Sequence, residues 1–413
     1  MTDAAVAPTG RQERISELDI IRGFALFGVL WMNVLTHADL AIPDAHLATL
    51  ATAQVDVVVS FLSRWLAAGK AQALFSMLFG FGFAIFMDRV EARGADARAI
   101  YLRRMGVLFA IGLAHLFLLW SGDILHSYAL AGFLLMLTRR WSDRTLLVVG
   151  VVLAVFCVPG ILLFEAIAYE GVPPFVAEQA AGQLRRWPLL QAADYPAFVI
   201  ENARTVWGEV YGYPTVPLFF GFILGRFMIG AWIYRRGWLQ DSAQHGRAIR
   251  RWAAILIAAG LVATGSRPFL ALAGVAAPEP LPILLSALTW AGIAALALGY
   301  AAAILSLCRQ EAWRRRLSGL GAAGQMALTN YVSQSVVYMF VLYGFGLGLL
   351  PYCGATFALA FSLVLFALQV AFSRWWLGRY RFGPLEWVWR SLTYGERQPM
   401  RSRAAEPAGL AAG

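Results

Sequence analysis

Long apolar runs alternate with short polar segments along almost the whole chain. A helix rises about 1.5 Å per residue, so roughly 20 apolar residues are needed to cross about 30 Å of hydrocarbon. Runs that approach or exceed this length predict ten membrane-spanning helices, near residues 20–37, 71–88, 105–121, 124–138, 145–167, 211–234, 252–273, 282–307, 324–349 and 354–375. The pattern therefore predicts an all-α fold, a polytopic membrane helical bundle of about ten transmembrane helices.

Composition and charge agree with a membrane protein and argue against a nucleic-acid partner. Of the 413 residues, 60% are hydrophobic and 14% are charged, and the mean hydropathy is +0.63. The net charge of +10 is spread over short arginine clusters between the apolar runs. If the N-terminus is inside, 27 of the 34 basic residues fall in inward-facing segments, as the positive-inside rule predicts. We therefore expect both termini to be cytoplasmic, with the lipid bilayer as partner.

The same pattern divides the chain into regions. We expect a polar cytoplasmic N-terminal tail, an N-terminal transmembrane region with two outer-face segments, a C-terminal transmembrane region and a disordered tail, at residues 1–17, 18–235 (outer-face segments 38–70 and 168–210), 236–400 and 401–413. In "VDVVVSFLSRWL", helical spacing of the apolar residues predicts an amphipathic helix at the interface. Residues 168–210 form either a cap over the outer face or a structured connector.

The first apolar run carries an unusual polar stripe. At about 100° per residue, Asp19, Arg22, Asn33 and His37 fall within an arc of roughly 60°. Such side chains are costly in lipid and normally face a bundle interior or a wet cavity. Two interpretations stay open: the stripe lines a cavity, or Asp19 and Arg22 anchor the inner interface while Asn33 joins two helices.

Several stretches resemble a known family. "LDIIRGFALFGVLWMN" resembles the first helix of the YeiB-like bacterial membrane proteins. "GQMALTNYVSQS", "LYGFGLGL" and "FGPLEWVWRSLTYGERQP" resemble the C-terminal signature of that family, which is catalogued as domain of unknown function 418. The resemblance covers most of residues 17–400 and implies a multi-pass protein of the bacterial cytoplasmic (inner) membrane.

YeiB-like proteins in turn resemble transmembrane acyltransferases such as the lysosomal heparan-α-glucosaminide N-acetyltransferase. There, an acyl group from cytosolic acetyl-CoA reaches an acceptor on the far side, and an Asn and a His after a "D-x-x-R-G" helix are implicated in catalysis. The resemblance carries that Asn over to Asn33. His37 matches the His at a shorter spacing, and His46 is a rival for the role. It implies acyl-CoA as co-substrate and a small-molecule or glycan acceptor.

The residue types suit thioester chemistry, which needs a base and a donor that stabilises the developing oxyanion. Asn33 and His37 are four apart, so they share one helix face and are expected to reach one reacting carbon. Arg22 precedes Asn33 by eleven residues, about 16 Å of helix, a span comparable to a pantetheine arm. Arginines bind phosphate bidentately. The candidates for phosphate binding, which topology alone would also place there, are Arg22, Arg103, Arg104 and Arg390.

A second polar group lies in the short third and fourth spans, in "LAHLFLLWSGDILHSYAL". Asp123 at the outer turn is placed to orient a histidine and raise its basicity. We expect either catalytic or substrate-binding roles for His115, Asp123, His126 and Tyr128, or satisfied structural ones. The spacing does not define a metal site, and the three cysteines are far apart, so we expect no metal.

The ninth span presents a broad polar face that includes Asn330 and Gln334. Interhelical hydrogen bonding and the lining of a substrate cavity explain this face equally well. After the last span, "RYRFGPLEWVWRSLTYG" is rich in Trp, Tyr and Arg, which predicts a segment along the cytoplasmic surface.

Three functions remain in competition. The first is an acyltransferase that moves an acetyl or other acyl group from cytoplasmic acyl-CoA to an outside acceptor. The second is a transporter or flippase of a small polar or lipid-linked substrate without covalent chemistry. Few carboxylates lie at mid-membrane depth, which favours the enzyme over a proton-coupled carrier. The third is a sensor or assembly partner, and a homodimer with a second copy is kept as an open alternative.

Overall fold

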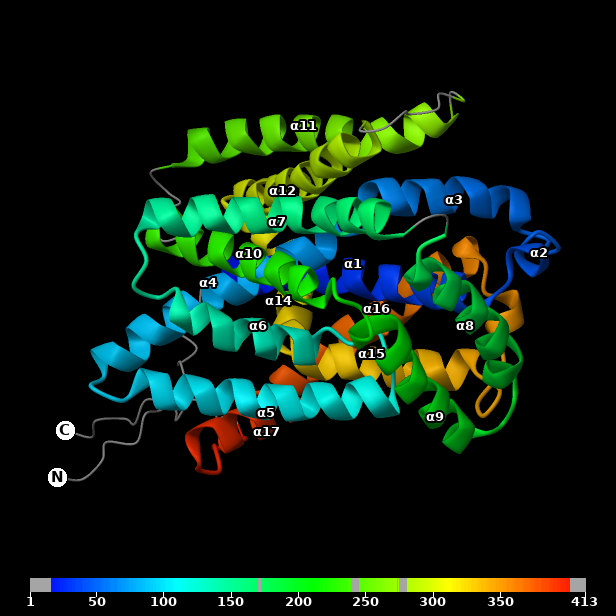
Figure 1. Cartoon of the computed structure of the whole chain (residues 1–413). Helices are drawn as coiled ribbons and strands as arrows, with labels where there is room; N and C mark the ends of the chain where they lie inside the picture. The colour runs from blue at the N-terminus through cyan, green and yellow to red at the C-terminus, as the bar shows by residue number, and fades with distance from the viewer. Residues whose placement is uncertain (1–15, 170–171, 239–244, 273, 275–280, 402–413) are drawn as a thin grey trace, which may run out of the picture.

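The computed structural model describes residues 16–169, 172–238, 245–272, 274 and 281–401, and these residues form an α-helical bundle (Figure 1). The predicted tails, residues 1–17 and 401–413, lie almost wholly outside the described residues. The long helices are α1 (Ser16–Ala41), α4 (Lys70–Ala92), α5 (Ala97–Leu118), α6 (Leu125–Leu137), α7 (Asp143–Ala168), α10 (Val216–Arg235), α11 (Gly246–Leu272), α12 (Leu281–Cys308), α15 (Ala327–Leu342) and α16 (Ala355–Leu377).

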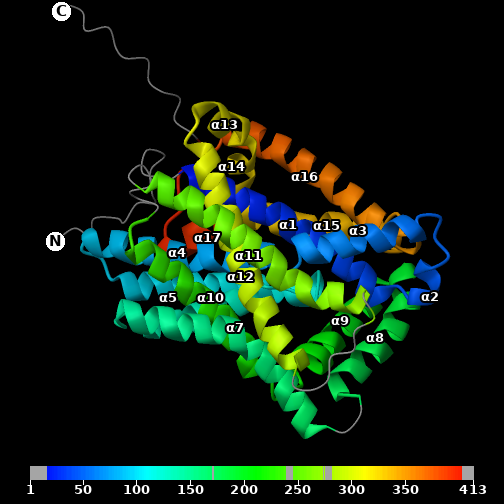
Figure 2. The same ribbon diagram turned by 90° about the horizontal axis from the view of Figure 1, so that it is seen from above.

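The shorter elements gather at the two ends of this bundle (Figures 1 and 2). At one end lie α2 (Asp44–Leu47), α3 (Ala53–Leu66), α8 (Pro174–Gln191), α9 (Tyr195–Thr205), a π-helical turn (Val206–Tyr211) and a 3₁₀ turn (Leu350–Tyr352). At the other lie α13 (Glu311–Arg316), α14 (Ser318–Gln325) and α17 (Pro384–Tyr394). The arginine-rich connections lie at the α17 end, which the positive-inside rule assigns to the cytoplasm.

Each of the ten predicted spans contains a helix, and the fold class is confirmed. Among the described residues, eight helices are long and apolar enough to cross a membrane. The other two predicted spans correspond to α6, with 13 residues, and α15, with 16. The prediction of one continuous helix over 324–349 is wrong, because the chain breaks at Met326 between α14 and α15 and leaves helical geometry again at Tyr343.

Helix α1 occupies the centre of the bundle. Its apolar window is 61% buried, against 28% for α7, α11 and α12. It crosses α14 where Gly23 and Gly324 face each other's helix: a Cβ on either glycine would collide with a backbone carbonyl, that of Leu320 or Asp19. Small residues permit this backbone-to-backbone approach. The central position explains why α1 can carry polar groups.

The break before α15 has an identifiable cause in α17. Glu386 Oε1 accepts hydrogen bonds from the backbone N–H groups of Leu328, at 2.7 Å, and Thr329, at 3.1 Å, while Oε2 accepts from Thr329 Oγ1 at 2.5 Å. Helix N-termini have unpaired N–H groups and a partial positive charge, so a carboxylate there is stabilised. Burial raises the pKa of the Glu386 carboxyl, and the Thr329 and Leu328 donors oppose that shift.

The outer segment 168–210 contains α8 and α9, whose side chains cap the ends of other helices. Gln183 Nε2 on α8 donates to the carbonyls of Asp39 and Ile42 at the end of α1, at 3.0 and 2.9 Å. Asn202 Nδ2 on α9 donates to the carbonyls of Leu116 and Phe117 at the end of α5. These amides satisfy carbonyls that a helix end leaves unpaired. The segment therefore holds the outer ends of α1 and α5.

Helix α3 confirms the predicted amphipathic helix next to this cap. Val55, Val58 and Leu62 are 54%, 57% and 40% exposed, as expected for a face turned towards lipid. Asp56 on the same helix accepts a hydrogen bond from Thr356 N at 2.7 Å and so caps the start of α16.

Candidate functional site: a chamber along the central helix

A chamber of about 580 Å³ runs beside α1 and is the candidate functional site. Its walls come from α1, α4, α5, the loop and start of α6, α14, α15 and α17. The volume lies within the roughly 300–1,000 Å³ typical of small-molecule sites. Residues from Arg22, near the cytoplasmic end of α1, to Leu40, near its outer end, line it. The chamber therefore extends along most of the central helix.

The cytoplasmic end of the chamber is basic and aromatic. Arg22 Nη1 donates to Asp19 Oδ1 at 2.7 Å, and the Arg104 guanidinium carbon lies 3.8 Å from the centre of the Trp389 ring. Arg390 and Glu386 from α17 line the same end. Asp19 and Glu386 offset part of this positive charge, whereas Arg104 forms no ion pair within the described part of the chain. Guanidinium groups held on aromatic faces keep their N–H fork available to an anion.

The middle of the chamber is largely apolar. Phe75, Phe79, Phe83 and Phe86 recur on one face of α4 and line the wall. Phe79 stacks on Phe227 at 4.6 Å, which fixes its ring. This part of the wall suits a flexible apolar ligand segment.

Two polar residues interrupt the apolar middle. Gln72 on α4 and Tyr128 on α6 both line the chamber. The Tyr128 hydroxyl lies 2.6 Å from Ser76 Oγ and donates to the Gln72 carbonyl at 3.3 Å. The tyrosine hydroxyl is therefore held at the wall, while the Gln72 side chain extends from the same turn of α4.

At its outer end the chamber meets Asn33, Thr36, Leu40 and Trp120. Asn33 makes no side-chain hydrogen bond within the described residues, although the residue itself is half-buried. A half-buried amide without a protein partner in a cavity wall is available to a ligand. The polar stripe predicted for α1 thus reaches the chamber at both ends, through Arg22 and Asn33.

The structure separates His37 from Asn33, against the expectation that both reach one reacting carbon. His37 Nδ1 lies 2.9 Å from the Tyr343 hydroxyl, and its ring packs 4.6 Å from Trp120 and 4.4 Å from Tyr338. It lines a small outer pocket of about 40 Å³ instead. Leu40 and Trp120 line both cavities, so they form the partition between them. One helical turn places His37 on the far side of Trp120.

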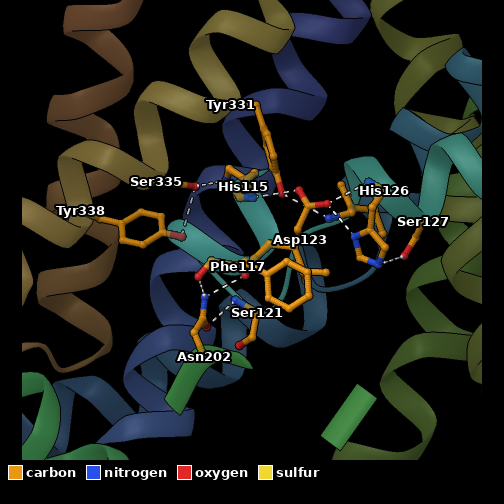
Figure 3. Close-up of polar contacts among 12 residues, drawn as sticks. His115, Phe117, Ser121, Asp123, His126, Ser127, Asn202, Tyr331, Ser335 and Tyr338 are labelled. Atoms are coloured by element: carbon orange, nitrogen blue, oxygen red, sulfur yellow. Dashed lines mark hydrogen bonds and ion pairs between the residues drawn. The ribbon is translucent and has the colours of Figure 1, made fainter. Parts of the chain in front are cut away.

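In the second predicted polar group, both histidines contact the aspartate, but these three side chains are buried away from the chamber. Asp123 lies between two imidazoles, with Oδ1 2.9 Å from His115 Nδ1 and Oδ2 2.7 Å from His126 Nδ1 (Figure 3). His115 Nε2 lies 2.7 Å from Ser335 Oγ, and His126 Nε2 lies 3.0 Å from Ser127 Oγ. We call His115, Asp123 and His126 the His–Asp–His cluster.

The His–Asp–His cluster and the chamber lie on opposite faces of one loop. Trp120, Gly122, Ile124 and Leu125 line the chamber, whereas Asp123 points to the two histidines (Figure 3). Each member of the cluster is at most 5% exposed. A buried carboxylate that bridges two imidazoles fixes the loop on which it lies. In this conformation the cluster supports the chamber wall and does not reach the chamber.

The polar face of α15 forms interhelical hydrogen bonds. Asn330 Nδ2 donates to the Ala323 carbonyl and to Ser373 Oγ, both at 3.1 Å. Gln334 Nε2 donates to Gln369 Oε1 at 2.9 Å, and Gln369 donates back to the Asn330 carbonyl. Of the two interpretations kept open for this face, the structure supports the first, because these amides join α15 to α14 and α16.

The predicted site residues therefore fall into two sets. The chamber brings together Arg22, Asn33, Arg104, Tyr128 and Arg390. It does not include Arg103, His37, His115, Asp123, His126, Asn330 and Gln334. Arg103 is exposed on α5. His46 on α2 contacts the Pro351 carbonyl at 2.8 Å, remote from the chamber.

Sequence reasoning missed several chamber residues, chiefly Gln72, Trp120 and the inward-facing Glu386. A polar side chain inside an apolar run is itself a signal, and it would have found Gln72. No local pattern marks Trp120 as a partition, because its role depends on how the loop folds. Among the described residues, no group of three His, Cys, Asp or Glu side chains is placed to hold a metal.

The fold and the chamber define a class: a multi-pass α-helical membrane protein with a ligand-sized cavity along its central helix. Residues 233–396 match the family described as "Protein of unknown function (DUF418)". The chain is 29% identical to uncharacterized protein YxaH of Bacillus subtilis (strain 168), over 97% of this chain and 99% of that protein.

Two further relatives are similar over nearly their whole length. The chain is 28% identical to an uncharacterized 39.9 kDa protein in the amylase 3′ region of Bacillus acidopullulyticus, over 95% of this chain and 97% of that protein. It is 28% identical to uncharacterized protein YeiB of Escherichia coli (strain K12), over 95% of this chain and all of that protein. No solved structure matches the chain. The chain is thus similar to YeiB-like proteins over nearly its whole length, and its C-terminal part matches the DUF418 family.

Proposed function

We propose that this protein is an acyltransferase of the bacterial cytoplasmic membrane that takes an acyl group from cytoplasmic acyl-CoA and transfers it to an acceptor on the outer side. One observation carries the proposal: a single chamber begins among Arg22, Arg104 and Arg390 and ends at Asn33. A ligand with an anionic head and a long, mostly apolar arm fits that order of charge and polarity.

The basic end of the chamber is the proposed site for the coenzyme phosphates. Arg104 and Arg390 supply guanidinium groups that lie over the Trp389 and Phe382 rings, while Arg22 shares its charge with Asp19. Arginine remains charged at any working pH and matches phosphate geometry. The aromatic middle then accepts the pantetheine arm, and the outer end accepts the thioester.

At the outer end, Asn33 is the proposed donor to the thioester carbonyl oxygen. The acceptor hydroxyl or amine attacks the carbonyl carbon, the new C–O or C–N bond forms, and the C–S bond breaks. The acceptor proton passes to a base, and the coenzyme leaves as a thiolate that is protonated in water. His37 is the proposed base, since its Nε2 has no hydrogen-bond partner within the described residues, and Trp120 must move for it to reach the chamber.

The test is acyl transfer by the purified protein in detergent with labelled acetyl-CoA and longer acyl-CoAs. Saturable binding is expected for wild type, and binding without transfer is expected for Asn33→Ala. The matched control is Asn330→Ala, which lies outside the chamber; where it folds, it should keep transfer per folded molecule. Absence of any acyl-CoA binding by folded wild type would contradict the proposal.

A second candidate is a carrier or flippase for an anionic amphiphile. The observation that favours it is that none of the histidines considered as a base lines the chamber. A carrier needs the basic entrance and the path but no base. Proteoliposomes separate the two functions, because a carrier moves its substrate unchanged, whereas the enzyme releases free coenzyme A.

A further inference from the structure

One buried arginine, Arg226, does not line the chamber and takes no part in the proposed reaction. Arg226, on α10, is 1% exposed and is the largest fully buried side chain described. Its guanidinium carbon lies 3.8 Å from the centre of the Phe222 ring and 5.6 Å from that of Trp290. Within the described part of the chain it forms no ion pair, and its Nε and Nη2 have no hydrogen-bond partner.

Charged side chains inside a membrane protein are costly and usually have a functional reason. The aromatic faces offset part of the cost of Arg226, but no carboxylate does so among the described residues. A methionine or leucine of similar size would pack there without that cost. The charge therefore calls for an explanation other than stability.

The polar contact of Arg226 leads directly to the chamber. Its Nη1 lies 3.5 Å from Oε1 of Gln72, a residue of the chamber wall. A guanidinium has donors only, so it orients the Gln72 amide with the oxygen towards itself. The NH₂ group of Gln72 is then the half available to the chamber. The nearby cation also polarises the amide and makes this NH₂ a stronger donor.

We infer that Gln72, oriented by Arg226, binds a carbonyl oxygen of the ligand's arm in the otherwise apolar middle of the chamber. This inference rests on the proposed function and deepens it, since a pantetheine arm carries amide carbonyls between its phosphates and its thioester. The basic end of the chamber recognises the nucleotide, and Gln72 distinguishes an amide-bearing arm from a plain hydrocarbon chain. Arg226 is a positioning residue that acts through Gln72.

The position of Gln72 along the chamber agrees with this assignment. Gly28 of α1 packs against Ala71, so Gln72 lies at the depth of the middle of α1. Six residues separate Arg22 from Gly28 and five separate Gly28 from Asn33, which corresponds to about 9 Å and about 8 Å of helix. A group bound by Gln72 therefore lies between the phosphate end and the thioester end.

The experiment compares two probes on the purified protein: coenzyme A, and its adenosine bisphosphate fragment, which lacks the arm. The dissociation constant of the fragment divided by that of coenzyme A measures how much the arm contributes to binding. Gln72→Met and Arg226→Met are expected to reduce this ratio about three- to tenfold, the worth of one hydrogen bond, with fragment affinity unchanged. Arg226→Lys keeps the positive charge but loses the planar guanidinium that orients the Gln72 amide, so it should give an intermediate ratio.

Thermal unfolding of the same variants separates binding from structure. Because Arg226→Met removes an uncompensated buried charge, its melting temperature is expected to equal or exceed that of wild type. A lower melting temperature with both probes weakened equally would make Arg226 structural and overturn the inference. An unchanged ratio in Gln72→Met, with the fragment still bound, would overturn the inference and leave the proposed function intact. Failure of wild type to bind either probe would overturn both.

Discussion

Residues 120–125 separate two polar regions on opposite faces, and the regions differ in whether their polar side chains have partners within the protein. On one face the His–Asp–His cluster is sealed, with Asp123 hydrogen-bonded to His126 and its other oxygen 2.9 Å from His115 Nδ1. On the other, the chamber contains Asn33, which has no side-chain partner within the described residues. Polar residues in a membrane bundle are equally unusual in both places. The difference teaches that close polar partners within the protein distinguish structural polar groups from those available to a ligand.

The strongest test of this comparison is to remove Asp123, which lies at the centre of the His–Asp–His cluster. Asp123→Ala leaves two buried imidazoles without their common partner and should cost about 3–5 kcal/mol of unfolding free energy, as for other broken buried pairs. The measurement is the loss of monodisperse protein on heating in detergent.

The matched control for Asp123 is Asp143→Ala. Asp143 pairs with Arg235 at 3.3 Å on the surface and is 44% exposed, so its loss should cost about 0–1 kcal/mol. If Asp123→Ala melts like wild type and loses only acyl transfer, the cluster is catalytic and the comparison fails.

Two asparagines sharpen the comparison. Asn330→Leu removes an amide with two acceptors and should cost about 1–3 kcal/mol of stability, because it leaves buried groups unpaired. Asn33→Leu should change stability by less than about 0.5 kcal/mol, since no protein hydrogen bond is lost.

Acyl transfer should show the opposite order. Asn33→Leu is expected to abolish transfer in a fully folded protein, whereas Asn330→Leu should lower the yield of folded protein without changing transfer per folded molecule. Equal stability losses in the two variants would show that Asn33 is as structural as Asn330.

Two adjacent arginines make the third contrast. Arg104 faces the chamber against Trp389, while Arg103 is exposed on the same helix. Arg104→Gln should weaken acyl-CoA binding roughly tenfold to a hundredfold, the range expected for a lost charged hydrogen bond. Arg103→Gln should weaken it less than about twofold.

The arginine contrast is measured by titration of the purified variants at two salt concentrations. Screening should reduce the difference between Arg104→Gln and wild type at high salt. An equal effect of both substitutions would show that general surface charge, and not the chamber, attracts the ligand.

The sequence predicts helices better than it predicts their interruptions. Each of the ten apolar runs contains a helix, and in the described part of the chain eight of these helices are long enough to cross a membrane, because hydrocarbon thickness sets the length of a span. The break at Met326 depends on Glu386, a residue about sixty positions further along the chain, so no local window contains the cause. The cap helices α8 and α9 are equally hidden, because their amides bind carbonyls of distant helices.

The candidate site could be predicted in part. Helical spacing places Arg22 and Asn33 on one face of α1, and both line the chamber. His37 lies within the same arc but further along the helix, where Trp120 screens it. The role of Asp123 was open because spacing cannot tell whether a carboxylate bridges two histidines or faces a cavity. Gln72 and Arg226 interact only through the packing of α4 against α10.

The central claim is that Asn33 of α1 faces a chamber that acyl-CoA fills from the cytoplasmic end. Its most direct test is thiol labelling of Asn33→Cys in a background where the buried Cys157, Cys308 and Cys353 are replaced by alanine. The account predicts labelling by a small maleimide that acetyl-CoA blocks in a saturable way, and no labelling of Asn330→Cys. Labelling of Asn33→Cys that no acyl-CoA slows, or no labelling at all, would contradict it.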